Sequence, residues 1–181
     1  MFKLPEDVLG ELYKHLDGSG YWNLLLLCRT GYEYYRRYLG EATERFKEEV
    51  DINVGSIDLE WIQLPLRISD SVTFNGRRHG TTVGILESPQ HKYVITCDFD
   101  KDKAVGTLEV VYETAPTDEY KLIWEYPITN GELPRRGVRC YTILEEGGIQ
   151  TKDKRYPGNK TLNQYILQYV VSREPSLLID M

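Results

Sequence analysis

The residues with the clearest potential for metal chemistry lie between positions 98 and 109. Their sequence is Asp98-Phe99-Asp100-Lys101-Asp102-Lys103-Ala104-Val105-Gly106-Thr107-Leu108-Glu109, which places acids at the first, third, fifth and twelfth positions of an EF-type calcium loop. Such a loop needs glycine at its sixth position and a helix on either side. This chain has Lys103 at the sixth position, and strand-like residues flank the loop. The sequence therefore favours a charged hairpin turn over a calcium site.

The other reactive side chains are scattered along the chain. His15, His79 and His91 are isolated, with no cysteine or acidic partner at metal-ligand spacing. The sequence contains no nucleophile elbow, phosphate-binding loop or dinucleotide-binding glycine pattern. A carboxylate pair that forms only on folding stays open as an alternative. We expect a non-catalytic protein with no metal site and no cofactor.

Composition limits the partners and the compartment. The 181 residues carry a net charge of −6 and lack the clustered basic face that nucleic acid requires. Hydrophobic runs are too short to cross a bilayer, and the acidic N-terminus is unlike a signal peptide. Cys28, Cys97 and Cys140 are odd in number and widely spaced, as expected of reduced thiols. We therefore expect neither nucleic acid nor membrane as a partner, and a cytoplasmic or nuclear location.

The N-terminal region carries two apolar helical patterns separated by the break Asp17-Gly18-Ser19-Gly20. In the first pattern, Pro5 suits the first helical position, and two acids follow it near the positive end of the helix dipole. The second helix is expected over Tyr21–Cys28 and contains four consecutive leucines. Such a run covers more than half of a helix surface and needs partners on at least two sides. The apolar stripe of the first helix consists of Leu4, Val8, Leu9, Leu12 and Leu16.

This region resembles the F-box family. The features that match are Leu4-Pro5-Glu6-Asp7-Val8-Leu9, the leucine-rich second helix and the closing Cys28-Arg29. The family usually has tryptophan shortly afterwards, whereas this chain has Gly31-Tyr32. The resemblance implies a helical unit that docks on a Skp-type adaptor. The alternative is a plain helical hairpin packed against its own domain.

A third helix is expected from Thr30, whose side chain and Glu33 fit a capping box, to about Glu49. Gly40 weakens the middle of this helix and favours a kink there. Beyond Ile52 the apolar period changes to two, so a domain boundary is expected near residues 50–56. The chain then divides into a helical domain, 1–50, and a β-rich domain, 51–181.

The β-rich region reads as successive hairpins with a spacing typical of repeat architectures. Pro65 favours an edge or a break in the first strand, and Asn75-Gly76 is a type I′ turn signal. The sequences around residues 100–106 and 130–137 occupy equivalent places. Strands are then expected over Thr81–Leu86, Tyr93–Phe99, Thr107–Thr114, Tyr120–Ile128, Val138–Leu144 and Ile149–Tyr156.

These units resemble degenerate MORN repeats, with Asn75 to Gly80 as the best match. The resemblance implies stacked hairpins in a continuous antiparallel meander, and the alternative is an ordinary antiparallel sheet with similar turns. A helix over Thr161–Glu174 is expected to cap the open end of the sheet, although residues 165–171 also fit a strand. The predicted fold class is α+β, with a three-helix F-box-like unit followed by the meander. Arg77, Arg78, Arg135 and Arg136 could form a basic rim for an acidic segment or a phosphate, but we favour the alternative in which they protect turns and edges against aggregation.

Two functions follow from these resemblances. The first is a substrate adaptor of a cullin-RING ubiquitin ligase of the SCF type, which docks the Skp adaptor through the helices and an unknown protein substrate through the sheet. The second is a minor capsid or virion protein of a large DNA virus, which uses the same helices to bind capsid proteins; its location is then the host cell or the virion. The residues assigned to the docking face are Leu4, Pro5, Val8, Leu9, Leu12, Leu16, Leu24, Leu25, Leu27 and Cys28.

Overall fold

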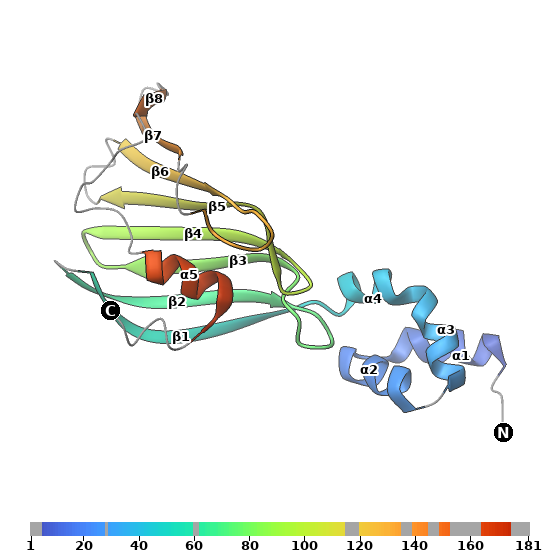
Figure 1. The fold of residues 1–181 in the computed structure, drawn as a ribbon. Coiled ribbons are helices and arrows are strands. Elements are labelled where there is room, and N and C mark those ends of the chain that lie inside the picture. Colours follow the sequence, from blue (N-terminus) through green and yellow to red (C-terminus); the bar gives the residue numbers. More distant parts are fainter. Residues whose placement is uncertain are drawn as a thin grey trace.

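The computed structural model describes residues 5–27, 29–59, 62–114, 120–134, 139–144, 149–152 and 164–174. A set of short helices lies beyond one end of a long twisted sheet, and a further helix packs on one face of that sheet (Figure 1). The helices are α1 (Glu6–His15), α2 (Gly18–Leu27), α3 (Arg29–Tyr35), the 3₁₀ turn η1 (Arg36–Tyr38), α4 (Leu39–Arg45) and α5 (Gln164–Ser172). The strands are β1 (Glu48–Leu59), β2 (Ile62–Val72), β3 (Gly80–Glu87), β4 (His91–Asp100), β5 (Lys103–Thr114), β6 (Tyr120–Pro127), β7 (Arg139–Leu144) and β8 (Ile149–Lys152).

The first two helices form as a pair with a shorter break than expected. Pro5 is the N-cap of α1 rather than its first helical residue, and its carbonyl accepts the Leu9 amide at 3.1 Å. The predicted glycine-rich break is wrong, because Gly18 and Gly20 belong to the first turn of α2. Asp17 explains the early start, since its Oδ1 accepts the Gly20 amide at 2.6 Å as a helix cap does.

The predicted third helix is divided. α3 ends at Tyr35, η1 follows, and α4 ends at Arg45, so the expected single helix to Glu49 is wrong. The interruption precedes Gly40 rather than falling on it. Thr30 is also inside α3 rather than capping it, because the helix begins at Arg29. The helical residues therefore end before β1 starts at Glu48, slightly ahead of the expected junction at 50–56.

The antiparallel meander and the mixed α+β class are confirmed. Within the described residues the strands pair in sequence order from β1 to β8, and each predicted strand coincides with one of them as far as the description reaches. β5 begins at Lys103 rather than Thr107, so Gly106 lies within the strand, at a bulge opposite Cys97. Pro65 causes no break in β2. Proline has no amide hydrogen to donate, but the pairing of β2 with β3 begins only at Leu66, so no hydrogen bond to β3 is required of Pro65.

The hairpin turns differ from one another. Lys101 and Asp102 both have positive φ, as do Asn130 and Gly131, and these two pairs make the two-residue turns that suit a twisted hairpin. The charged hairpin turn predicted between Asp98 and Glu109 is thus confirmed, with the turn itself at Asp100 to Lys103. The type I′ turn predicted at Asn75-Gly76 is wrong: only Gly76 has positive φ, and its amide donates to the Thr73 carbonyl at 2.8 Å across a three-residue loop.

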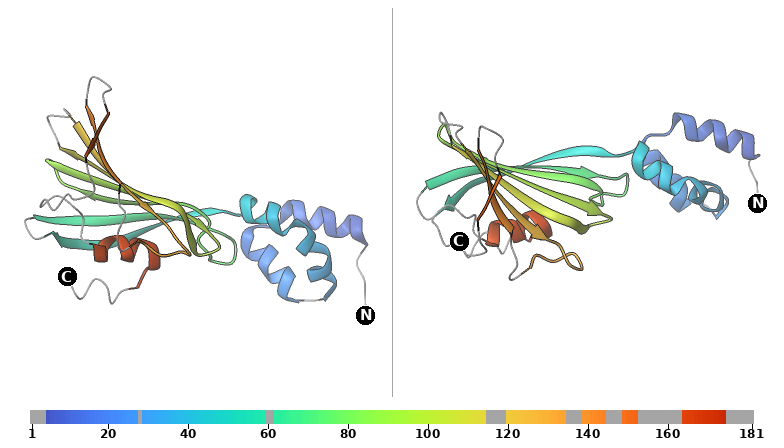
Figure 2. Two further views of the ribbon diagram at one scale, coloured as in Figure 1. Left: turned by 45° about the horizontal axis from the view of Figure 1, so that its top comes forward. Right: turned by 90° about the horizontal axis from the view of Figure 1, so that it is seen from above.

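The C-terminal helix is confirmed as α5, but it covers a face of the sheet rather than its open end (Figures 1 and 2). Its apolar side chains join the sheet core, which includes Leu66, Ile95 and Leu108. Arg78 donates to the carbonyls of Val170, at 3.0 Å, and Val171, and its guanidinium lies 3.7 Å from the centre of the Phe99 ring. Arg78 therefore holds α5 rather than contributing to a basic rim, whereas Arg135 and Arg136 lie outside the described residues.

A buried ion pair fixes the far end of α5. The Arg173 guanidinium donates through Nε and Nη2 to the two Asp70 oxygens, at 3.0 and 2.7 Å. Thr82 Oγ1 donates to the same carboxylate at 2.6 Å. The Asp70 side chain is only 4% exposed, so these donors offset the cost of removing its carboxylate from water.

The helical region contacts the sheet through the loop between β2 and β3. The Phe74 ring of this loop lies 4.9 Å from the ring of Tyr21, centre to centre. His79, expected to be isolated, has Nε2 3.0 Å from Glu44 Oε1 and Nδ1 3.3 Å from Asp100 Oδ1. This histidine therefore lies between a carboxylate of α4 and a carboxylate of β4.

Replacing Arg173 with methionine should cost about 3–5 kcal/mol of unfolding free energy, because it leaves the Asp70 carboxylate buried without its counter-charge. The matched control is Arg37→Met, which removes an exposed pair with Glu6 at 3.5 Å and should cost at most about 1 kcal/mol. Urea denaturation measures both. Equal losses would contradict a stabilising role for the buried pair.

The junction should weaken in acid. A hydrogen bond from His79, helped by Lys47, lowers the pKa of Glu44. A carboxyl group with a lowered folded pKa stabilises the fold above its unfolded pKa of about 4.3, and this contribution disappears as the pH falls through the folded value. Glu44→Gln should therefore lose less stability than the unmodified chain between neutral pH and pH ~3. The control is Glu48→Gln, at an exposed glutamate of β1, whose stability should depend on pH as that of the unmodified chain does. If the stability of Glu44→Gln also depends on pH in this way, Glu44 does not stabilise the junction through its charge.

Candidate partner-docking site on the N-terminal helices

The N-terminal helices enclose a small core made largely of aromatic rings. Tyr21 packs edge-on against Tyr13 and Tyr35, with ring centres 5.8 and 5.9 Å away. The Tyr21 hydroxyl donates to the Tyr35 carbonyl at 2.7 Å, and the Tyr35 hydroxyl donates to the Leu9 carbonyl at 3.1 Å. Burial raises the pKa of Tyr21 to about 12.

Only part of the predicted docking face points into this core. Leu9 and Leu25 are 5% and 7% exposed and belong to the cluster. Leu16 and Leu24 are half-buried against its edge. These four leucines hold the helices together and offer a partner little surface.

Other predicted residues remain on the surface. Val8 is 40% exposed and Leu12 is 39% exposed. They are one turn apart on α1, on a stripe rotated by about 100° from Leu9 and Tyr13. Pro5 is also exposed at the start of the same helix. Leu4 and Cys28 lie outside the described residues, as does the side chain of Leu27.

Within the described part of the N-terminal helices, three exposed apolar residues were absent from the predicted docking face. Leu26 of α2 is 66% exposed, and Tyr32 and Leu39 are also exposed. The run of four leucines in α2 was the signal for Leu26, because one helix cannot bury every side of such a run. The signal for Tyr32 was its position as an aromatic residue shortly after Cys28-Arg29.

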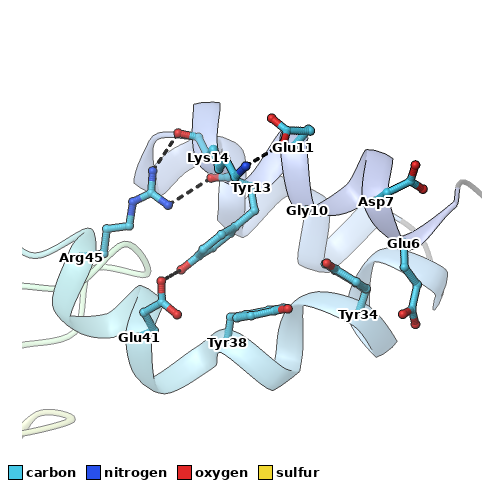
Figure 3. A pocket seen from close by; sticks show the side chains of 10 residues that line it. All are labelled: Glu6, Asp7, Gly10, Glu11, Tyr13, Lys14, Tyr34, Tyr38, Glu41 and Arg45. Carbon is cyan, nitrogen blue, oxygen red and sulfur yellow. Dashed lines mark hydrogen bonds and ion pairs between the residues drawn. The ribbon is translucent and has the colours of Figure 1, made fainter.

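A groove separates α1 from the segment α3–η1–α4 (Figure 3). Its volume is about 530 Å³. The Tyr13 hydroxyl donates to Glu41 Oε1 at 3.3 Å across it, and burial raises the pKa of Tyr13. The Tyr13 and Tyr38 rings stack with centres 5.2 Å apart. The groove is lined by Glu6, Asp7, Gly10, Glu11, Tyr13, Lys14, Tyr34, Tyr38, Glu41 and Arg45.

The two cations of the groove are held by the chain itself. Lys14 lies 2.6 Å from Glu11. Arg45 of α4 donates to the carbonyls of Tyr13 and Lys14, at 3.2 and 2.9 Å, and so caps the end of α1. The Arg45 guanidinium also lies 4.9 Å from the centre of the Tyr13 ring. The Arg45 side chain therefore links α4 to α1 across the groove, and both cations of the groove already have partners within the chain.

The remaining reactive groups have structural surroundings. Burial raises the pKa of the Cys97 thiol to about 11, which keeps this cysteine protonated and unreactive near neutral pH. His91 Nδ1 lies 2.8 Å from the Tyr112 hydroxyl, and the two rings stack. Among the described residues, no three histidine, cysteine or acidic side chains are close enough together to hold a metal ion.

Comparison with known proteins adds nothing to this geometry. No family model, no curated protein and no solved structure matches the chain. None of the described helices has the length and apolar character needed to cross a membrane.

Removing the Arg45 side chain should detach α4 from α1. Arg45→Ala loses two hydrogen bonds from a charged donor and a ring contact, so the helical region should lose about 2 kcal/mol of stability. Arg36→Ala, at an exposed arginine of η1, is the control and should change stability by less than about 0.5 kcal/mol. Amide hydrogen exchange across α1 measures both variants, and unchanged exchange in Arg45→Ala would contradict the capping role.

Proposed function

We propose that the chain is a non-catalytic substrate adaptor of a cullin-RING ubiquitin ligase, with the N-terminal helices docked on a Skp-type adaptor. The observation that carries the proposal is the uncovered stripe formed by Val8 and Leu12 on α1. The aromatic core already fills the interior of the helical unit, so Val8 and Leu12 do not contribute to its packing as the buried residues do. The resemblance to the F-box across Leu4 to Arg29 gives the stripe a partner.

Energetics favour a partner for this surface. Complete burial of a Val or Leu side chain stabilises a complex by roughly 1.5–3 kcal/mol. Val8, Leu12 and Leu26 are 40%, 39% and 66% exposed, so covering the part that remains in water supplies about 2–4 kcal/mol in all, and polar contacts around them supply specificity. An interface of about 1,600 Å² is the usual size for a stable complex. The acids at the start of α1, Glu6 and Asp7, would lie at its rim.

The sheet has the complementary role in this proposal. The β2–β3 loop fixes the helices at one end of the meander, so a target bound along the strands would be held at a defined distance from the adaptor. The ubiquitin-transfer chemistry would belong to other subunits of the ligase, and this chain would need no cofactor. A cytoplasmic or nuclear location follows from the same proposal.

Val8→Asp combined with Leu12→Asp should abolish binding to a purified Skp-type adaptor while leaving the fold intact, because both side chains are already partly in water. Leu9 is unsuitable for this test, since an acid at that buried position would unfold the helices. Isothermal titration calorimetry measures the affinity, and circular dichroism checks the fold.

The matched control is Val105→Asp on β5, because Val105 is also 40% exposed and lies on the sheet. This variant should bind the adaptor as the unmodified chain does. Absence of binding by the unmodified chain, or equal binding by the double variant, would end the adaptor proposal.

A further inference from the structure

The sheet has a second face that no described element covers. α5 packs on one face, and in both views of Figure 2 the opposite face is free of described helices and strands. We call this opposite side the outer face. The side chains on it alternate with the core residues along each strand, as the burial patterns of β3 and β4 show.

An apolar row crosses the middle of the outer face. Strand register places Ile85 beside Val94, Val94 beside Val111, and Val111 beside Ile123. Ile123 is buried by its surroundings, whereas the other three are half-buried. Four apolar side chains in line across β3 to β6 are unusual for a sheet face that meets only water, because exposed faces of antiparallel sheets normally carry polar residues.

A charged row runs parallel to the apolar row. Register places Glu87 beside Lys92 and Lys92 beside Glu113, and Lys121 Nζ lies 2.5 Å from Glu113 Oε1. The charges thus alternate from β3 to β6 as minus, plus, minus, plus. When the row is read from its two ends, Glu87 corresponds to Lys121 and Lys92 corresponds to Glu113, so each residue has the opposite charge to its counterpart.

We propose that the outer face binds a second copy of this chain in a two-fold symmetric dimer, with the axis parallel to the strands and midway between β4 and β5. A two-fold rotation about this axis keeps each row at its own level and reverses its order. Glu87 then faces the partner's Lys121, and Lys92 faces the partner's Glu113. Every charge in the row meets its opposite.

The same rotation opposes no like charges in the other two rows. Val94 faces the partner's Val111 at the centre of the interface, and the half-buried Ile85 lies outside them, opposite the partner's Ile123, which is already buried in its own chain. In the third row, which contains Val83, Thr96, Glu109 and Glu125, Thr96 faces Glu109 and Val83 faces Glu125, so no two acids are opposed. Two sheets packed face to face in this way form an aligned sandwich.

The alternation of charge identifies the occupant. A uniformly basic or acidic partner would meet a like charge at every second position of the charged row, and like charges in an interface cost several kcal/mol. A second copy is the partner whose charge order is certain to complement this row. The proposal does not depend on adaptor binding, since the stripe on α1 belongs to the helical region at the end of the sheet.

The test uses two single variants and their mixture. Lys92→Glu places an acid opposite the partner's Glu113, and Glu113→Lys places a cation opposite the partner's Lys92. Each variant alone should self-associate at least about tenfold more weakly than the unmodified chain. An equimolar mixture should recover association, because in each mixed dimer both contacts between positions 92 and 113 again join an acid to a lysine. Sedimentation equilibrium measures all three samples.

Controls separate the interface from folding. Lys14→Glu and Glu11→Lys reverse charges in an equivalent neighbouring pair on α1 and should leave self-association unchanged. Thermal melting of each variant checks that the sheet is folded, and Val94→Asp should give a folded monomer. An unmodified chain that sediments as a monomer across the micromolar range would overturn the proposal, as would a mixture no more associated than its components.

Discussion

The contact of Phe74 with the aromatic rings of the helices is the interaction on which the arrangement of the molecule depends. Phe74 comes from the loop between β2 and β3, yet its ring lies 4.9 Å from Tyr21 and 6.4 Å from Phe46, centre to centre. Gly18 makes room for it, because a Cβ at that position would lie 3.0 Å from the Phe74 Cβ. The helical region therefore completes its core with a side chain of the sheet. Since that core is closed by rings, the stripe of Val8 and Leu12 stays outside and becomes available for another protein.

Two arginines help to hold α5 on the apolar face of the sheet. Arg78 and Arg173 both donate to the Val170 carbonyl near the C-terminal end of α5, where positive charge also favours the helix dipole. Arg173 continues to the buried Asp70 carboxylate on β2. These bonds hold α5 on the inner face, with Val170 against Gly84, where a Cβ would lie 3.5 Å from the valine side chain. Because α5 covers only this face, the apolar and charged rows of the outer face stay uncovered by any described helix.

The sequence allowed prediction of features that depend on local periodicity and turn chemistry. The helical character of α1, the strand order of the meander and the location of α5 along the chain were recoverable, because their periods and turn residues are local signals. Which leucines of the helices are buried and which are exposed could not be predicted. Leu9 is buried and Leu26 is exposed because the core is filled by tyrosine rings and by Phe74, which is distant in sequence. The early start of α2 depends on the Asp17 cap, and the placement of α5 on a face depends on pairing of Asp70 with Arg173. The F-box and MORN resemblances, and the function drawn from them, stay predictions.

The central claim is that the exposed stripe of α1 belongs to an interface with a Skp-type adaptor. Nuclear magnetic resonance of the isotope-labelled chain during titration with that purified adaptor tests it most directly, because each amide reports its own surroundings. The account predicts that the largest shift changes occur at Val8, Leu12 and Leu26, with small changes along β3 to β6. A titration that changes no shift, or that changes only amides of the sheet, would contradict the account.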